Sequence, residues 1–339
     1  NYLASFTQRL LFGLSVVLLL WQLVSFIDTR KYNLPKIVVF ILMIASSCFF
    51  AFRFMSGYIA KDKQQAQKFA ASYEKAYRKY QNIPQPLITD VKTQVHLFPS
   101  LNSYTIEGDY TIKNKSNSHI QSILFNFDDD LKIEKAQYVS AFETISLSQY
   151  TNEVTLKQAL APNDSAILKF TISYSWLPVN GHQSFNAIIE NGTFMRISRY
   201  YPKIGYQSDY ELTDSIERTQ FGLGAATALK KIDDNRTAAN DFIHLDMTID
   251  TEYGQTAVGT GELTKQWSRN GRNYFQYKTP EPVPFRFAVA SARYKAKSIL
   301  HDSLRITVLY HPRHEENVDH LIQNAKLTLD YCRKNFGAY

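Results

Sequence analysis

The sequence predicts two transmembrane helices, then an all-β saddle or sandwich domain, and finally an amphipathic helix near the C-terminus. Three observations support this fold class. Two long runs without charge lie near the N-terminus, at residues 10–27 and 37–52. From residue 87 onward, apolar residues alternate with a period of two, which is typical of strands. After residue 310 the period returns to that of a helix.

The two N-terminal runs are long enough to cross a bilayer. Roughly 18 helical residues extend roughly 27 Å, which is close to the thickness of the hydrocarbon core. Lys36 and Arg53 flank the second run, and their side chains can reach lipid headgroups. The alternative is a pair of buried core helices, but neither run carries the polar stripe of such a helix. A signal peptide would explain the first run and not the second.

The charge of the chain is concentrated beside these runs. The net charge is +7, yet residues 1–82 carry 11 Lys+Arg and 3 Asp+Glu, so the remaining residues sum to −1. Basic side chains next to a span meet anionic lipid, whereas a nucleic-acid site needs a basic cluster in the soluble part. We therefore expect a multi-pass protein of the cell membrane, in contact with the lipid bilayer and with no nucleic-acid partner. The Lys and Arg residues on the two sides of the spans are too evenly divided to orient it.

Residues 58–83 form the predicted stalk between the membrane part, residues 1–57, and the β-domain. Two alternatives stay open for it: an interfacial helix on the membrane surface, or a continuation of the second span. Pro84 and Pro86 end the helical pattern. The residues that recur at helical spacing are Ala66, Phe69, Tyr73, Ala76, Tyr77 and Tyr80.

Residues 84–310 are predicted to form a large antiparallel sandwich or saddle-shaped sheet. Turn-forming clusters separate the strand-like segments, and a short helix is possible within residues 213–229. The predicted strands lie within residues 91–99, 104–114, 120–127, 131–139, 166–176, 242–250, 274–279 and 305–310.

The segment "HPRHEENVDH", residues 311–320, raises the question of a zinc site. A helical site needs histidines at i and i+4, but His314 and His320 are six residues apart, or roughly 240° around a helix. His311 precedes the helix. We instead predict a helix over residues 313–336, with Glu315 and Glu316 in its first turn, Arg333 and Lys334 in its last turn, and Gly337 as its C-terminal cap.

Two other segments suggest function. Gly254 and Gly259 have the gap of a phosphate-binding loop, but Thr260 and Gly261 stand where that motif needs Lys and Ser/Thr, so we interpret them as turn glycines. Residues 191–212, "NGTFMRISRYYPKIGYQSDYEL", are either a connecting loop whose tyrosines pack on the sheet or a surface that meets a following domain or a ligand. No catalytic, cofactor-binding or metal-binding residue is expected in this chain.

The order of four segments resembles the aminopeptidase N family of zinc metallopeptidases, in a bacterial form fused behind an ABC-transporter permease membrane part. These segments are residues 84–125, residues 191–212, "PVPFRFAVASARY" at 282–294, and residues 310–339. The resemblance implies a saddle-shaped β-domain over 84–310. It also implies that residues 311–339 start a truncated, α-rich, thermolysin-like catalytic domain, entered through an element that Phe336-Gly337-Ala338-Tyr339 resembles.

The departures from the family limit what is carried over. Its zinc motif, H-E-x-x-H with a further Glu downstream, is absent from this sequence and would follow Tyr339. Its Pro-Cys-x-Asp-Glu-Pro element corresponds to Pro202-Lys203-Ile204-Gly205-Tyr206, which lacks the Cys and the acidic pair. We expect a fragment of a longer polypeptide, with further membrane helices upstream and zinc bound only downstream.

The resemblance implies the membrane anchor and non-catalytic N-terminal β-domain of a membrane-bound aminopeptidase, inactive alone. Its expected partners are the downstream catalytic domain, peptide substrates of the parent and an ABC-transporter ATPase subunit. The alternative is a non-enzymatic, membrane-tethered β-sandwich that binds or senses a partner for a transporter permease.

Overall fold

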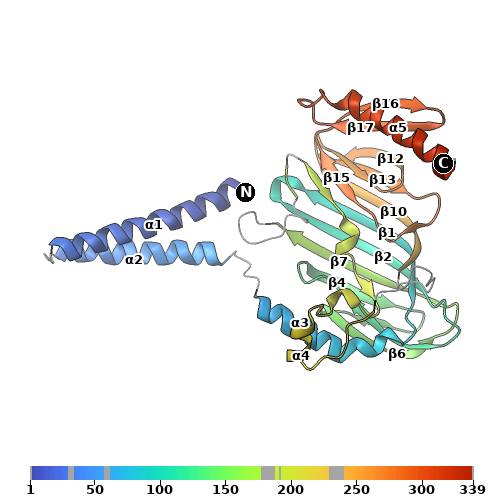
Figure 1. Cartoon of the computed structure of the whole chain (residues 1–339), viewed down its shortest axis with the longest axis horizontal. Helices are drawn as coiled ribbons and strands as arrows, with labels where there is room; N and C mark the ends of the chain where they lie inside the picture. Colours follow the sequence, from blue (N-terminus) through green and yellow to red (C-terminus); the bar gives the residue numbers. More distant parts are fainter. Residues whose placement is uncertain are drawn as a thin grey trace.

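The computed structural model describes residues 2–29, 34–56, 62–176, 188–190, 192–228 and 240–337. Two long apolar helices come first, a mostly β body follows, and a helix lies at the C-terminal end (Figure 1). This arrangement confirms the predicted order of elements.

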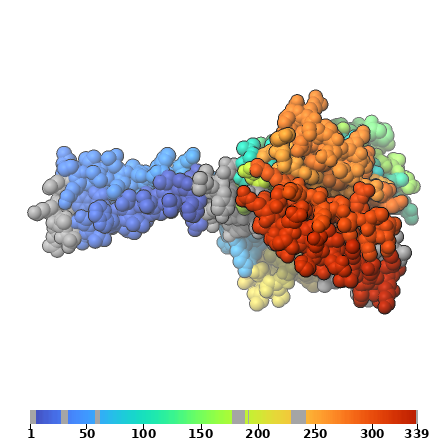
Figure 2. Space-filling view, turned by 90° about the horizontal axis from the view of Figure 1, so that it is seen from above, coloured from blue at the N-terminus to red at the C-terminus, as the bar shows by residue number. Residues whose placement is uncertain are grey.

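The two N-terminal helices are α1 (Tyr2–Thr29) and α2 (Leu34–Met55). Both are long and apolar enough to cross a membrane by length and composition, with mean hydropathies of 2.4 and 2.3 in their most apolar stretches. They lie side by side, because Phe12 stacks on Phe54 at 5.9 Å and Phe26 meets Phe40 edge-on at 5.3 Å. Only 0% and 6% of those stretches are buried, so neither is a core helix of the β body. Figures 1 and 2 show the pair as a rod apart from that body.

The stalk contains a helix of its own, α3 (Lys63–Tyr77), followed by a 3-10 turn, η1 (Arg78–Gln81). Asp62 is the N-cap of α3 and has extended backbone angles, and its side chain accepts a hydrogen bond from the Gln64 N–H. Because a helix cannot continue through an extended residue, α3 is not a continuation of α2.

One nine-stranded sheet forms most of the body. Its hydrogen-bonded order is β12-β13-β10-β1-β2-β7-β4-β5, with β14 paired to β10. The sheet is mixed rather than wholly antiparallel, because β1 and β10 run parallel. A parallel neighbour needs a long crossover, and more than a hundred residues separate these two strands along the chain. The strands are β1 (Leu87–Phe98), β2 (Ser103–Lys113), β4 (Lys132–Val139), β5 (Thr144–Ser146), β7 (Ser165–Ser175), β10 (Asn240–Glu252), β12 (Glu262–Arg269), β13 (Arg272–Lys278) and β14 (Val283–Pro284).

Smaller sheets and turns complete the body. Two three-stranded sheets have the orders β11-β15-β8 and β6-β3-β9. The possible helix within residues 213–229 is present as the six-residue α4 (Ser215–Gln220). The remaining elements are β3 (Ile120–Asn126), β6 (Thr151–Leu160), β8 (Thr193–Met195), β9 (Lys203–Ile204), β11 (Thr256–Gly259), β15 (Val289–Ala292), and the 3-10 turns η2 (Pro99–Leu101), η4 (Ile197–Tyr200) and η5 (Ser208–Tyr210).

The hydrophobic core lies on one face of the large sheet. Alternate residues of β1, β2, β7 and β10 point into it, as the period of two predicts. The segments that carry the family resemblance contribute core aromatics: Tyr201 meets Phe287 edge-on at 5.0 Å and stacks on Tyr110 at 6.4 Å. These segments are therefore placed in the core by packing.

The C-terminal end is a hairpin with a helix beside it. β16 (Lys295–His301) and β17 (Leu304–Tyr310) form a two-stranded sheet, and α5 (Val318–Phe336) lies next to it (Figure 1). The orange and red residues of this end cover much of the face seen in Figure 2.

The start of α5 was predicted five residues too early. Two turns, closed by His314 N–H to His311 C=O at 2.8 Å and Val318 N–H to Glu315 C=O at 3.1 Å, occupy the chain before Val318. Glu315 and Glu316 therefore precede the helix, and Asp319 is the acidic residue of its first turn. The C-terminal prediction is confirmed: Arg333 and Lys334 lie in the last turn, and Gly337 caps the helix with a φ of 104°.

Candidate functional site

The three histidines of residues 311–320 all have exposed side chains. His311 and His314 share one turn, with ring centroids 5.6 Å apart, while His320 lies in the first turn of α5. The prediction that His314 and His320 lie on one helix is therefore wrong, because His314 precedes α5. In the part of the chain that the structure describes, none of the three belongs to a group of converging metal ligands.

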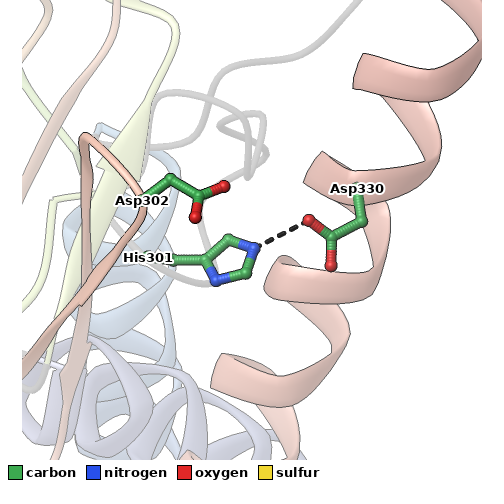
Figure 3. Close-up of side chains that lie close together, drawn as sticks. All are labelled: His301, Asp302 and Asp330. Atoms are coloured by element: carbon green, nitrogen blue, oxygen red, sulfur yellow. Dashed lines mark hydrogen bonds and ion pairs between the residues drawn. The ribbon is translucent and has the colours of Figure 1, made fainter.

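A different cluster of possible ligands lies between the β16–β17 hairpin and α5. One ligand atom each from His301, Asp302 and Asp330 lie within 4.8 Å of one another. Figure 3 shows the His301 ring and the Asp302 carboxylate at the hairpin tip, facing Asp330 on the helix. His301 Nε2 is 2.8 Å from an Asp330 carboxylate oxygen. Sequence reasoning missed this cluster because Asp330 lies 28 residues after Asp302 along the chain, and only the fold brings it to the adjacent His301 and Asp302.

The surroundings favour ion pairing over metal binding at this cluster. The Asp302 carboxylate is already bound by the Arg333 guanidinium, and this pairing lowers the pKa of Asp302. Lys297 and Asp319 form a further pair at 2.7 Å along the same side of α5. A single histidine and two half-exposed carboxylates, one of them neutralised, do not fit the zinc set that the family resemblance implies. The cluster links α5 to the hairpin through exposed ion pairs.

Two of the three glycines of residues 253–265 lie at turns between strands, and the third, Gly259, is the last residue of β11, paired with Val289. Gly254 has a φ of 82° between β10 and β11, and Gly261 has a φ of 103° between β11 and β12. A Cβ at Gly261 would come within 2.5 Å of the Lys278 carbonyl oxygen, so this position needs glycine. The turn interpretation is confirmed for Gly254 and is wrong for Gly259, which lies in β11.

The aromatic segment 191–212 is divided between two surroundings. Its first part packs in the core, where Tyr201 is buried and its hydroxyl lies 2.8 Å from that of Thr93. Its second part meets the stalk. Tyr206 stacks on Tyr73 of α3 at 5.5 Å, and Tyr210 meets the same ring edge-on at 5.2 Å.

Tyr73 is the centre of this contact between stalk and body. It is only 2% exposed, and its hydroxyl oxygen accepts a hydrogen bond from the Gln207 N–H at 3.0 Å. Burial raises the pKa of Tyr73 to about 12, so the phenol stays neutral. The stalk therefore presents its aromatic face to the β-domain.

A buried ion pair lies beside Tyr73. The Glu74 carboxylate, 1% exposed, accepts two hydrogen bonds from the Arg218 guanidinium, at 2.7 and 2.9 Å. Arg218 also donates to the carbonyls of Leu212 and Gly224, each at 2.7 Å. Hydrogen bonding to Glu74 raises the pKa of Arg218. Bidentate pairing with further carbonyl acceptors is the geometry that compensates for burying a guanidinium.

Glu211 completes the network behind this pair. Its carboxylate accepts from the Tyr206 hydroxyl and the Thr227 N–H, each at 2.8 Å, and from the Thr227 hydroxyl. Burial alone would raise the pKa of Glu211, but these hydrogen bonds outweigh it and lower the pKa. Residues 204–227 thus lie along α3, and the buried polar groups named here have hydrogen-bond partners.

The face of the large sheet opposite the core carries a second network of polar side chains. His96 Nδ1 lies 2.5 Å from the buried carboxylate of Asp250, which Arg272 also binds. The guanidinium of Arg272 lies 4.5 Å from the Phe98 ring centroid. Hydrogen bonding to Asp250 raises the pKa of His96. These residues link three neighbouring strands, β1, β10 and β13.

A shallow groove of about 320 Å³ lies on the same face. Its walls combine charges of both signs, including Lys92, Lys135, Lys169, Glu107 and Asp109. Lys169 and Asp109 are 4.0 Å apart, so part of this charge is paired within the groove. The groove offers hydrogen bonds to a polar ligand but no nucleophile with an adjacent base.

Comparison with known proteins identifies no family. No protein-family model matches the chain, and no curated protein matches it. Among solved structures, an M1 zinc metallopeptidase from Deinococcus radiodurans is similar with a TM-score of 0.44 and 13% identity, over 75% of this chain and 54% of that one. A variant of that enzyme with a bound Tyr-Ser-Ala substrate gives the same values. A two-domain variant with bound L-tryptophan is covered over 55% of its length. The chain thus spans about half the length of these structures.

Proposed function

We propose that this chain is the membrane anchor and non-catalytic N-terminal β-domain of a membrane-bound zinc aminopeptidase. The parent protein would remove N-terminal residues from peptides, with zinc held by residues downstream of this chain. In that arrangement the β-domain walls the active site and restricts it to peptide ends. An ABC-transporter permease part upstream and its ATPase subunit belong to the same proposal.

The observation that carries the proposal is the order of elements along the chain. Two apolar helices, a stalk, a large mixed sheet and a helix followed by Gly337 come in the order that the resemblance implies. The segments "RYYP" at 199–202 and "PVPFRF" at 282–287 meet in one core through Tyr201 and Phe287, which supports their common origin in one domain.

The test is to assay the whole gene product, including whatever follows Tyr339, in membranes. We expect release of N-terminal residues from an aminoacyl nitroanilide, abolished by a zinc chelator and restored by zinc. Residues 1–339 alone should give no release. A whole product without an H-E-x-x-H motif, or inactive with zinc supplied, would contradict the proposal.

One observation favours the alternative of a tethered binding or sensor module. The groove between β1, β2, β4 and β7 is open and polar, as a ligand surface on a sheet can be. If the whole product has no peptidase activity, Lys92→Gln and Lys135→Gln should weaken binding of its partner.

A further inference from the structure

The stalk helix α3 is joined to the β-domain by a contact that is unusual for a linker. A linker between a membrane anchor and a domain is ordinarily exposed and polar. Here Ala71, Tyr73 and Glu74 of α3 are buried against residues 204–227. The outer side of α3, with Lys68, Ser72 and Lys75, remains exposed.

From this we infer that residues 204–227 are a clamp that fixes α3 and thereby holds the β-domain close to the membrane. The inference rests on the membrane anchoring of the proposed function and not on its peptidase activity. The clamp has three parts, each described above: the Tyr73 ring contacts, the Glu74–Arg218 pair and the Glu211 network.

Chain length sets the distance that the clamp enforces. Roughly eight residues separate Met55, at the end of α2, from Lys63, at the start of α3, and they can span at most about 28 Å in any conformation. Lys63 lies 3.0 Å from Glu217 of α4, so this edge of the body lies beside the start of the stalk. With α3 clamped, α4 therefore stays within about 40 Å of the end of α2, allowing for one helix diameter.

Release of the clamp would lengthen the tether considerably. Residues 63–86 would join it, and α3 as a free helix together with the extended residues after it would add about 50 Å. Any substrate or partner of the domain would then no longer be confined to the neighbourhood of the bilayer. The clamp is thus a device that sets the height of the domain above the membrane.

The Glu74 carboxylate has ion-pair partners on both the stalk and the body. Glu74 is followed four residues later by Arg78, which donates to Glu74 and, at 2.8 Å, to the Ala225 carbonyl. The Glu74 carboxylate is therefore bound by one guanidinium group from the stalk and one from the clamp. A stalk that lay on the membrane instead would leave the buried Arg218 with only Glu211, at 3.8 Å, as a counter-charge.

The experiment measures distances by double electron–electron resonance on the whole chain in lipid nanodiscs. Cys48 and Cys332 are first replaced by alanine. One spin-label pair is placed at Gln65→Cys on α3 and Ser165→Cys at the start of β7, both exposed positions. A second pair at Ser56→Cys and Gln220→Cys reports the height of the domain above the span.

We expect one narrow distance for the first pair and distances below about 40 Å for the second. Arg218→Met should broaden the first distribution and move at least half of the second to longer distances. The matched control is Lys63→Gln, which removes the exposed ion pair at the same junction and should change neither. Glu74→Gln, which keeps the size of the side chain, serves as a second variant should Arg218→Met not fold.

A broad distance distribution for the first spin-label pair, in the protein with Glu74 and Arg218 intact, would overturn the inference. Unchanged distances in both Arg218→Met and Glu74→Gln, when both are folded, would also overturn it. If the chain could be purified in solution without lipid, this would contradict the membrane anchoring instead. The distance between the first pair of labels could still be measured and would still test the clamp. Absence of peptidase activity in the parent protein affects neither distance, so the two proposals fail separately.

Discussion

Glu74 of α3 and Arg218 of α4 are 144 residues apart in the chain and form a bidentate ion pair in the interior, at 2.7 and 2.9 Å. Neither residue exposes more than 4% of its surface. The pair joins the stalk to the β-domain and makes the stalk part of the folded body.

Replacing Arg218 by methionine should destabilise the protein by about 3 kcal/mol, because the buried Glu74 carboxylate would lose two charge-assisted hydrogen bonds and keep only Arg78 as its partner. Urea unfolding, followed by far-ultraviolet circular dichroism, measures the free energy of unfolding. Lys63→Gln is the control, since Lys63 is 82% exposed and its ion pair with Glu217 is screened by water. An equal loss in both variants would show that the buried pair has no special role.

His96 should make the free energy of unfolding depend on pH. Its pKa is raised in the folded state, first by hydrogen bonding to Asp250. A raised pKa means that the protonated form is stabilised by folding, so this contribution is complete below the unfolded pKa of about 6.5. It disappears as the pH rises through the folded value. The difference in stability between the native protein and His96→Gln should therefore shrink as the pH rises above about 6.5. A difference that grows with pH would contradict the assignment of Asp250 as the partner of His96.

Zinc should not bind tightly at either histidine cluster of the C-terminal region. His311, His314 and His320 are all exposed, His320 lies on α5 apart from the turn that holds the other two, and Asp302 is held by Arg333. Isothermal titration of residues 1–339 with zinc should give no stoichiometric binding, and His320→Ala should change nothing. Arg333→Gln is the informative comparison, because it frees Asp302 beside His301 and Asp330. Tight binding by the native chain, lost in His301→Ala, would show that the ion-pair interpretation is wrong.

The periodic parts of the fold could be predicted from the sequence, because burial on one face of a strand or helix leaves a repeating pattern. All eight predicted segments contain strands, and the C-terminal cap at Gly337 is confirmed. Strands without alternation were missed, including β12, whose side chains are all exposed. The parallel pairing of β1 with β10 also leaves no local signal, because it depends on the path of the intervening chain.

The contacts of the stalk could not be predicted for a similar reason. Helical spacing identified Tyr73 and Tyr77 as one face, but it does not say what covers that face. Both open alternatives placed α3 against lipid or in line with α2, whereas it lies on the β-domain. The partner residues, Tyr206 and Arg218, were within or near a segment noted for its aromatics, but only the fold brings them to α3.

Deleting residues 1–57 should release the β-domain into the soluble fraction. The two apolar helices lie within this segment, and the aromatic face of α3 is covered by the body, so the truncated protein has no comparable anchor in the part of the chain described. Ultracentrifugation of membranes after a high-salt wash separates the two outcomes. Truncated protein that still pelleted would identify a second membrane contact, for which exposed Phe69 is the first residue to replace.

The docking of α5 on the β16–β17 hairpin can be tested with two neighbouring residues of the helix. Ile322 is 5% exposed on the side that faces the hairpin, whereas Leu321 is 52% exposed. Ile322→Ala removes buried apolar surface and leaves a cavity, which typically costs about 2–5 kcal/mol.

Because α5 lies at the end of the described chain, this loss should open the helix locally rather than unfold the whole body. Hydrogen exchange of amides 318–336 should become much faster in Ile322→Ala and remain unchanged in Leu321→Ala. Exchange that stays as slow as in the native protein in both variants would mean that the exposed ion pairs to His301 and Asp302 hold α5, and that the apolar contact contributes little. Equal acceleration would mean that Leu321 is covered in solution, as it would be if a following domain packed against it.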